Sequence, residues 1–363
     1  MIVVAGDIHM GLKDLGHRTG DSVASLGYVL EIASVLSRKS KQFVPVILAG
    51  DIWDSVNVHP QVLQSAQFQR KAYNDVPIWY INGNHDRVTP SWTEFLGANQ
   101  LYDWRTHEIA GLNVLGIDWT LPKDFKEKLK SAISKKKLDL LIVHQFIEDC
   151  DDSIITNSIP VSVFDDLDCP VIAGDIHQEL IVKNKVVYTS CTNRRAVNQP
   201  DGSCLIVATR DEERYIPAKM DTEQVTHING LDIYRVHLPS RPVVVWKVPG
   251  TFEMEDVSKV PLDPAGPWLP YVVLMADAFD PEAVRELNTR ADGHAFIIYR
   301  KNNVDIIEDE DVEEEKFVLD GSREYARKAL KDYPISDGAK DLAMNMLEDE
   351  DTFFESLKEN FGL

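Results

Sequence analysis

Polar side chains of the types that bind divalent metal ions gather in five short segments, most of which follow an apolar run. The segments read GDIH at 6–9, GDIWD at 50–54, GNHD at 83–86, IVHQ at 142–145 and GDIH at 174–177. Carboxylate, imidazole and amide oxygen together favour Mn²⁺, Fe²⁺, Zn²⁺ or Mg²⁺ over soft metals. Two such ions about 3.5–4 Å apart would suit displacement at phosphorus, by activating a water and holding the phosphoryl oxygens. The candidate residues are Asp7, His9, Asp51, Asp54, Asn84, His85, Asp86, His144, Asp175 and His177.

Three of these segments share the sequence Ala-Gly-Asp-Ile, which begins at residues 5, 49 and 173. They do not form a repeat of fixed period, and their flanking sequences do not align. Each follows an apolar run, and strand ends in an open α/β sheet are where ligands bind. We therefore expect three strand ends that present similar groups to one cleft.

The elements that must position these groups alternate along the N-terminal half of the chain. Short apolar runs predict buried strands, and apolar residues at helical spacing predict helices, with Asp21 as a candidate N-cap. This alternation indicates an α/β fold whose sheets are covered on both faces. The expected strands are 2–5, 44–50, 77–83, 138–144, 169–175 and 185–190, and the expected helices are 22–39 and 59–76.

The pattern changes near residue 239, where a proline-rich stretch leads into a second, smaller α/β domain. Its expected elements are strands at 271–278 and 294–300 around a helix at 281–291. An acidic run at 305–316 predicts a solvated connector, and the last residues have apolar side chains at helical spacing. The predicted organisation is a metal-binding domain at 1–238, a cap at 239–305, and a connector with a helical tail at 306–363.

The net charge of −21, from 38 basic and 59 acidic residues, argues against a free-standing, nonspecific nucleic-acid binder. It does not exclude a nuclease, because metal ions or a basic partner can offset the acidic groups. No apolar run approaches the roughly 20 residues that cross a bilayer, and no signal peptide is recognised, so we expect a cytoplasmic protein without membrane association. The four cysteines match no zinc pattern and are expected to be free thiols.

The ordered series Asp-x-His, Gly-Asp-x-x-Asp, Gly-Asn-His-Asp, His and Gly-x-x-His resembles that of the calcineurin-like metallophosphoesterases. The resemblance covers about residues 1–215 and implies a two-sheet α/β sandwich. Within that superfamily, AGDIWD, NGNHD and the PSRPV that enters the second domain are most similar to SbcD-type nuclease subunits of double-strand-break repair complexes. The narrower resemblance implies a small α/β cap domain and a helical C-terminal tail.

The resemblance also implies a role for each candidate residue. His85 would act on the scissile phosphate or its leaving oxygen, with Asp86 orienting the imidazole, and Asp51 would bridge two metal ions. The remaining ligands would form two sets, Asp7, His9 and His177 for one ion and Asn84, His144 and Asp175 for the other.

Asp175 departs from the family pattern, which places a histidine at this position. A carboxylate is shorter than an imidazole and adds negative charge, so the second ion would sit closer to the strand, bind through water or bind weakly. The extra anion favours harder ions, and we expect two-metal binding with a preference for Mn²⁺, with Mg²⁺ as the other candidate.

The leading hypothesis is a two-metal-dependent DNA exonuclease or endonuclease, the catalytic subunit of an SbcCD-like complex acting in DNA repair and recombination. The resemblance implies DNA as substrate, an SbcC-type coiled-coil ATPase as partner, and a homodimer within a heterotetramer, in the cytoplasm of a bacterial or phage-infected cell. The alternatives are a metallophosphatase or cyclic-nucleotide phosphodiesterase on the same site, and a non-catalytic scaffold whose site has decayed at Asp175. The tail would either pack on its own domain or dock the ATPase through Phe353, Phe354, Leu357 and Phe361.

Overall fold

The computed structural model of the chain describes residues 1–11, 20–133, 137–149, 158–194, 201–262, 269–291 and 294–301. The predicted connector, the helical tail and the docking residues Phe353, Phe354, Leu357 and Phe361 lie outside the described residues, and so stay predictions. Within the described ranges, no helix is both long enough and apolar enough to span a bilayer.

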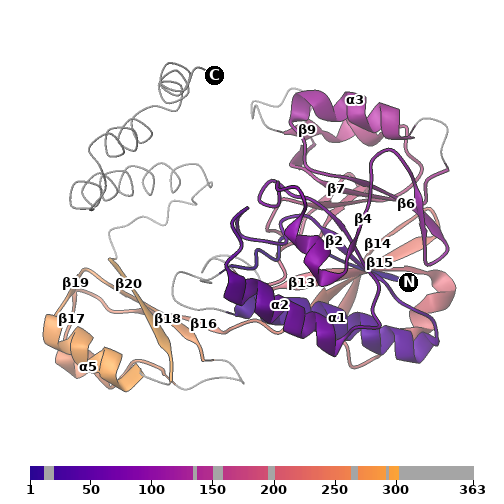
Figure 1. Cartoon of the computed structure of the whole chain (residues 1–363). Coiled ribbons are helices and arrows are strands. Elements are labelled where there is room, and N and C mark those ends of the chain that lie inside the picture. The colour runs from indigo at the N-terminus through magenta and orange to yellow at the C-terminus, as the bar shows by residue number, and fades with distance from the viewer. Residues whose placement is uncertain are drawn as a thin grey trace, which may run out of the picture. The chain divides into compact units, whose positions relative to one another are not determined.

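Two large sheets form the framework of the site, and the predicted two-sheet α/β fold is confirmed (Figure 1). The seven-stranded sheet has the order β14 (Thr222–Ile228), β15 (Leu231–His237), β13 (Ser203–Thr209), β1 (Ile2–Ala5), β2 (Val46–Ala49), β3 (Ile78–Ile81) and β4 (Asn99–Gln100). The six-stranded sheet has the order β11 (Ile181–Val182), β12 (Val186–Tyr188), β10 (Val171–Gly174), β7 (Leu140–His144), β6 (Leu112–Ile117) and β5 (His107–Ile109). A short parallel pair, β8 (Ile147–Glu148) and β9 (Ile159–Pro160), follows β7.

The uninterrupted apolar sequence of β1 is explained by burial on both of its faces. Successive side chains of a strand point to opposite faces, so Ile2 and Val4 pack against residues of the other sheet. Val3 and Ala5 pack into a second cluster with the helix that follows β1. All four side chains are completely buried, so a polar residue at any of them would lose its contact with water.

Helices cover the outer faces of the two sheets. α1 (Asp21–Ser40) and α2 (Pro60–Ala72) pack on the sheet that contains β1, and α3 (Pro122–Ile133) packs on the other sheet. Asp21 is not the N-cap of α1 as predicted: Gly20 occupies that position, and the Asp21 carboxylate accepts hydrogen bonds from Arg241 instead. α2 ends at Ala72 rather than residue 76, and the amide of its C-cap, Tyr73, donates to the carbonyl oxygen of Arg70. The short 3₁₀ helices are η1 (Trp92–Leu96), η2 (Val161–Phe164) and η3 (Arg210–Tyr215).

Parallel pairing brings the candidate residues to one edge of each sheet. β1 to β4 run parallel to one another, and β6, β7, β10 and β12 do the same in the second sheet. The carboxyl ends of neighbouring strands therefore lie together, and the metal-binding residue types follow those ends. The sheet topology thus accounts for the gathering of groups that are far apart in the sequence.

The rest of the described chain contains a three-stranded sheet of β16 (Val243–Lys247), β18 (Tyr271–Ala276) and β20 (Phe296–Lys301). α4 (Met254–Val257), α5 (Pro281–Ala291) and the pair β17 (Thr251–Phe252) and β19 (Ala278–Phe279) complete it. The chain divides into two compact units: one holds Met1–Trp246, Met254–Val273 and Glu282–Ile298, and the other holds Lys247–Glu253, Leu274–Pro281 and the residues from Tyr299 onward, of which 299–301 are described. The domain boundaries and the capping role of 239–305 stay predictions.

Candidate metal centre and active site

The loop after β1 presents Asp7 and His9 from an unusual backbone conformation. Asp7 has φ 51° and His9 has φ 49°, both in the left-handed region that side chains other than glycine rarely adopt. Backbone hydrogen bonds stabilise this loop: the Asp7 amide donates to the Gly50 carbonyl oxygen at 3.1 Å, and the His9 amide donates to that of Asp51 at 2.9 Å. Local strain of this kind concentrates at functional sites, where surrounding contacts maintain it.

The same conformation recurs in all three Ala-Gly-Asp-Ile segments. Asp51 has φ 48° and Asp175 has φ 94°, in addition to the value for Asp7. Only glycine fits at position 50, because the residue has φ 87° and an added Cβ would lie 2.4 Å from His144 Nδ1. The repeated sequence therefore encodes a repeated local structure, in which the chain leaves a buried strand and turns the aspartate toward the site.

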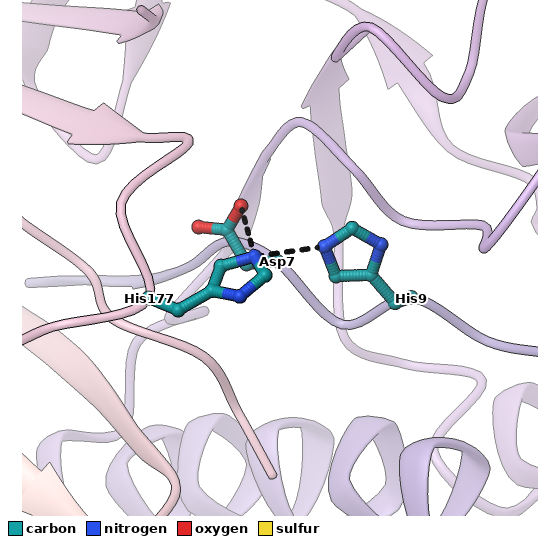
Figure 2. Close-up of side chains that lie close together, drawn as sticks. All are labelled: Asp7, His9 and His177. Atoms are coloured by element: carbon teal, nitrogen blue, oxygen red, sulfur yellow. Dashed lines mark hydrogen bonds and ion pairs between the residues drawn. The ribbon is translucent and has the colours of Figure 1, made fainter. Parts of the chain in front are cut away.

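Figure 2 shows how Asp7 and His9, from the loop after β1, meet His177, from the loop after β10. The Nε2 atoms of His9 and His177 lie 3.1 Å apart, and His177 Nε2 lies 3.8 Å from a carboxylate oxygen of Asp7. Two neutral imidazoles can share one proton across such a distance, or both can direct a lone pair at a cation. This donor set fits the first predicted metal position.

The Asp51 carboxylate lies at the centre of the site and is almost completely buried. Its Oδ2 atom is 3.4 Å from His144 Nε2, 3.6 Å from His9 Nε2 and 3.9 Å from His85 Nε2. Three imidazoles, from the loops after β1 and β3 and from the end of β7, therefore face one carboxylate oxygen. This arrangement leaves the Asp51 carboxylate within reach of the ligand atoms of several candidate metal-binding groups.

The ring of His144 is oriented by a backbone carbonyl. Its Nδ1 atom lies 2.8 Å from the Ala49 carbonyl oxygen, which places the Nδ1 proton there and leaves Nε2 facing the site. His144 Nε2 lies 3.2 Å from the Asn84 side-chain oxygen and 3.8 Å from an Asp175 carboxylate oxygen. His144 is completely buried, so this orientation has no competition from solvent.

The Asn84 amide tests whether these residues fit a cation. Its side-chain oxygen faces the Asp51 carboxylate, which offers only acceptor atoms, and lies 3.2 Å from His144 Nε2. An amide nitrogen at the same position would donate to the two Asp51 oxygens at 3.2 and 3.3 Å. The oxygen is the better group when a cation lies among these acceptors, because oxygen is a ligand for hard divalent ions and the amide nitrogen is not.

Three sets of side chains bring one candidate ligand atom each to within 4.8 Å of one another. Asp7, His9 and Asp51 each belong to two of the sets, and the bridging position expected for Asp51 stays a prediction. Asp7 enters the set of His144 as well as that of His177, which the resemblance did not imply. The sets are Asp7 with His9 and His177, His9 with Asp51 and His85, and Asp7 with Asp51 and His144.

The electrostatics of these residues follow from burial and from their proximity to one another. Burial raises the pKa of Asp7 to about 8; the His144 imidazole opposes that shift, and the Asp51 and Asp175 carboxylates add to it. Burial also disfavours the charged form of Asp51, but His144 and the other imidazoles outweigh burial and hold its pKa below the usual range. Burial acts against protonation of His144, yet Asp51 raises its pKa well above the ordinary value. The site thus retains protons on Asp7 and His144 that a bound cation would displace.

The expectation that Asp86 orients His85 is corrected by the structure. The Asp86 carboxylate accepts hydrogen bonds from the backbone amides of Ile52, Trp53 and Gly83 at 2.9–3.1 Å. His85 Nδ1 instead lies 2.9 Å from the Asp54 carbonyl oxygen. These three amides belong to the loops after β2 and β3, so the Asp86 carboxylate holds the two loops together. Burial and the nearby Asp51 raise the pKa of Asp86 to about 6, although these hydrogen bonds favour its charged form.

Asp175 lies beside the site without entering any of the three sets. Its carboxylate is 3.8 Å from His144 Nε2, and its backbone amide donates to both oxygens of Asp7 at 3.1 and 3.2 Å. The amide therefore helps to hold Asp7 as a carboxylate. Direct ligation by Asp175 stays a prediction.

The sequence matches the family model of the calcineurin-like phosphoesterases over residues 1–207, more than half of the chain, and the protein belongs to this family. It is thus a phosphoesterase of a family that uses divalent metals, and the described His and Asp sets are candidates for binding them. Among solved structures, the chain is similar to the nuclease MPE of Pseudomonas putida, with 15% identity and a TM-score of 0.25. That match covers 51% of this chain and 66% of the other, just under two thirds of it. No curated protein matches the sequence.

Some residues that shape the site were absent from the sequence expectations. The carbonyl oxygens of Ala49 and Asp54 orient two histidines, but a backbone oxygen leaves no signal in the sequence. The loop after β6 also reaches the site edge, because the Trp119 amide donates to the Asn82 carbonyl oxygen at 2.8 Å. An assignment of β6 as a strand parallel to β7 would have located this loop.

Proposed function

We propose that the protein is a two-metal-dependent phosphodiesterase that cleaves DNA, and that it works as the catalytic subunit of an SbcCD-like repair complex. The observation that supports two-metal chemistry is the position of Asp51, whose Oδ2 atom lies within 4 Å of imidazole nitrogens of His9, His144 and His85. Paired divalent ions supply a neutralising charge for the phosphoryl oxygens and a site that activates water. Mn²⁺ is the proposed ion, because the donor set is mixed and the additional carboxylate of Asp175 favours harder ions.

His85 has the exposure and the geometry of a group that meets the substrate. Its side chain is 40% exposed, whereas those of His9 and His144 are 3% and 0% exposed. Its Nδ1 proton is held by the Asp54 carbonyl oxygen, so Nε2 is the nitrogen that faces the site. In the imidazolium form, Nε2 can donate a proton to the oxygen that leaves phosphorus. The Asp51 carboxylate, 3.9 Å away, interacts favourably with that charged form.

Replacement of His85 tests this function directly. With Mn²⁺, the wild-type protein should cleave linear duplex DNA, single-stranded DNA and bis(p-nitrophenyl) phosphate. His85→Ala should lower turnover by about 10²-fold or more, because general acid catalysis contributes about 10²–10⁴-fold. His294→Ala, at an exposed position outside the site, is the matched control and should keep wild-type rates.

The outcomes separate the three functional classes. Cleavage of DNA that is lost in His85→Ala supports the proposal. Cleavage of only small phosphate esters or cyclic nucleotides would favour a phosphatase or cyclic-nucleotide phosphodiesterase. If no substrate is cleaved, even with an SbcC-type ATPase present, the result would favour a non-catalytic scaffold subunit.

The assembly is part of the same proposal. The net charge of −21 suits a subunit that relies on an ATPase partner for much of its DNA affinity. We propose docking of that partner by the C-terminal segment with Phe353, Phe354, Leu357 and Phe361, and a homodimer within a heterotetramer in the cytoplasm. Copurification of the partner with the full chain, and its loss on deletion of residues 340–363, tests the docking.

A further inference from the structure

Aromatic and arginine side chains form a rim beside the candidate active site, at the edge where the parallel strands end. We use the term aromatic rim for five residues that follow β3, β4 and β6. They are Arg87, Tyr102, Trp104, Arg105 and Trp119.

Hydrogen bonds place one part of the rim, Arg87 and Trp119, directly at the site loops. The Trp119 amide donates to the Asn82 carbonyl oxygen at 2.8 Å, two residues before the candidate ligand Asn84. On the other side, the Gln145 side chain, next to His144, donates to the Thr120 carbonyl oxygen at 3.1 Å. The guanidinium carbon of Arg87 lies 4.7 Å from the centre of the Trp119 ring. The Trp119 loop therefore lies between the loops that carry Asn84 and His144.

The other part of the rim is an exposed stack after β4. The rings of Tyr102 and Trp104 are stacked, with centres 5.5 Å apart and planes at 28°. The guanidinium carbon of Arg105 lies 4.9 Å from the Trp104 ring and 5.4 Å from the Tyr102 ring. Trp104 remains 63% exposed, although indole rings are on average largely buried in folded proteins.

Asp118 connects the two parts of the rim. Its carboxylate accepts a hydrogen bond from the Gln100 side chain at 3.0 Å and from the Asn82 backbone amide at 2.9 Å. Gln100 ends the strand that leads to Tyr102, and Asn82 begins the loop with Arg87. The stacked rings and the loop that carries Asn84 and His85 are thus anchored to the same half-buried side chain.

The charge of the rim differs from that of the rest of the protein. The chain has a net charge of −21, yet no ion pair joins Arg87 or Arg105 to a carboxylate of the described residues. The one acidic residue inside the stack, Asp103, is paired with Lys128 at 2.9 Å. Positive charge and planar rings together suit a nucleic acid strand, because phosphates bind the cations and bases stack on the rings.

We infer that the aromatic rim binds unpaired nucleobases that flank the scissile phosphate, so that a single strand is the form in which DNA enters the site. A paired base in a duplex has both of its faces stacked on its neighbours, and it must leave the stack before it can contact an indole. The inference rests on the proposed DNA phosphodiesterase function and specifies the substrate form for the same site.

A binding measurement with matched oligonucleotides tests the rim without any turnover. Fluorescence anisotropy would compare labelled oligothymidylate with an abasic strand of equal length and charge, with Ca²⁺ in place of Mn²⁺. The wild-type protein should bind oligothymidylate at least about tenfold more tightly. Trp104→Ala and Trp119→Ala should each weaken binding of oligothymidylate by about tenfold and leave that of the abasic strand unchanged, since one stacked base contributes about 1–3 kcal/mol.

Two further variants keep this test decisive. Trp119→Phe retains an aromatic ring and should retain most of the preference, which separates stacking from a folding defect. Phe43→Ala removes an equally exposed aromatic side chain just before β2, at the opposite end of the parallel strands, and should change nothing. Equal affinity of the wild type for both strands, binding of neither strand, or an unchanged preference in both alanine variants would overturn the inference.

Failure of the proposed function gives a different result. A protein that hydrolyses no phosphodiester with Mn²⁺, including bis(p-nitrophenyl) phosphate, would contradict the function and leave the base preference measurable. A protein that cleaves this ester but binds abasic and normal strands equally would support the phosphodiesterase function and contradict base binding by the aromatic rim.

Discussion

At the scale of single residues, backbone carbonyl oxygens determine which nitrogen two of the site histidines, His144 and His85, offer. The Ala49 oxygen lies 2.8 Å from Nδ1 of His144, and the Asp54 oxygen lies 2.9 Å from Nδ1 of His85. In both rings Nε2 is thereby turned to the site. The ordered motifs allowed these histidines to be predicted through the family resemblance. Their carbonyl partners were unpredictable, because any residue type supplies the same oxygen.

Proton release on metal binding is a prediction at this scale. In the metal-free protein the pKa of Asp7 is raised to about 8, so at pH 6–7 most molecules have a protonated Asp7. A cation needs the carboxylate, and binding must therefore displace that proton. The apparent affinity for Mn²⁺ should therefore rise with pH between pH 6 and about 8. The raised pKa of His144 adds a second displaced proton in the same direction.

Calorimetry at pH 6.5 in two buffers of different ionisation enthalpy measures this release as the number of protons per bound ion. We expect between one and two protons per event. A value near zero, with an affinity that does not change between pH 6 and 8, would contradict the assignment of Asp7 and His144 as ligands.

At the scale of elements, the site depends on strands that end in a left-handed aspartate. Most of the buried parallel strands were predicted, because burial on both faces demands uninterrupted apolar sequences such as that of β1, but the buried strands β6, β13 and β15 were missed. β14 was not predicted, since TEQVTHI is half-exposed at an edge of the sheet and has few apolar residues. The repeated Ala-Gly-Asp-Ile sequence indicated that three strand ends meet at one cleft. It did not reveal the left-handed backbone conformation of the aspartates, because φ depends on contacts between loops.

Replacement of Gly50 tests the importance of this turn. Gly50→Ala places a Cβ atom 2.4 Å from His144 Nδ1 and forces φ 87° on a residue with a side chain. We expect a loss of about 2 kcal/mol or more in the free energy of unfolding and at least about tenfold weaker Mn²⁺ binding. Gly97→Ala is the control, because Gly97 also has positive φ but has open space around it. That change should cost only about 1 kcal/mol of backbone strain and leave metal affinity unchanged.

Equal effects of the two substitutions on urea unfolding would mean that the contact with His144 is unimportant. Unchanged metal affinity in Gly50→Ala would mean that His144 is not held in place by this turn.

At the scale of the whole molecule, the PSRPV segment, which carries part of the family resemblance, also connects residues far apart in the sequence. Arg241 in this segment donates two hydrogen bonds to the Asp21 carboxylate at 2.6 and 2.7 Å, and also donates to the Leu269 carbonyl oxygen. Its guanidinium lies over the rings of Tyr271 and Phe296. The sequence indicated a change of organisation near residue 239, but the pairing with α1 is a contact across 220 positions that no local pattern reveals.

The Arg241–Asp21 pair is almost completely buried, which makes its loss measurable as stability. The side chains are 3% and 15% exposed, so removal of one partner leaves an unpaired charge with little solvent. Arg241→Met should lower the free energy of unfolding by about 3 kcal/mol. Arg241→Lys should restore only part of this loss, because lysine lacks the planar fork that binds both oxygens.

The double variant Asp21→Asn/Arg241→Met should lose less than the sum of its single variants, since neither charge is then left alone. Lys183→Met, which breaks the exposed pair with Asp149, is the control and should have little effect on urea unfolding. Additive losses in the double variant would show that the pair contributes no coupling, and α1 would then be held by its apolar face alone.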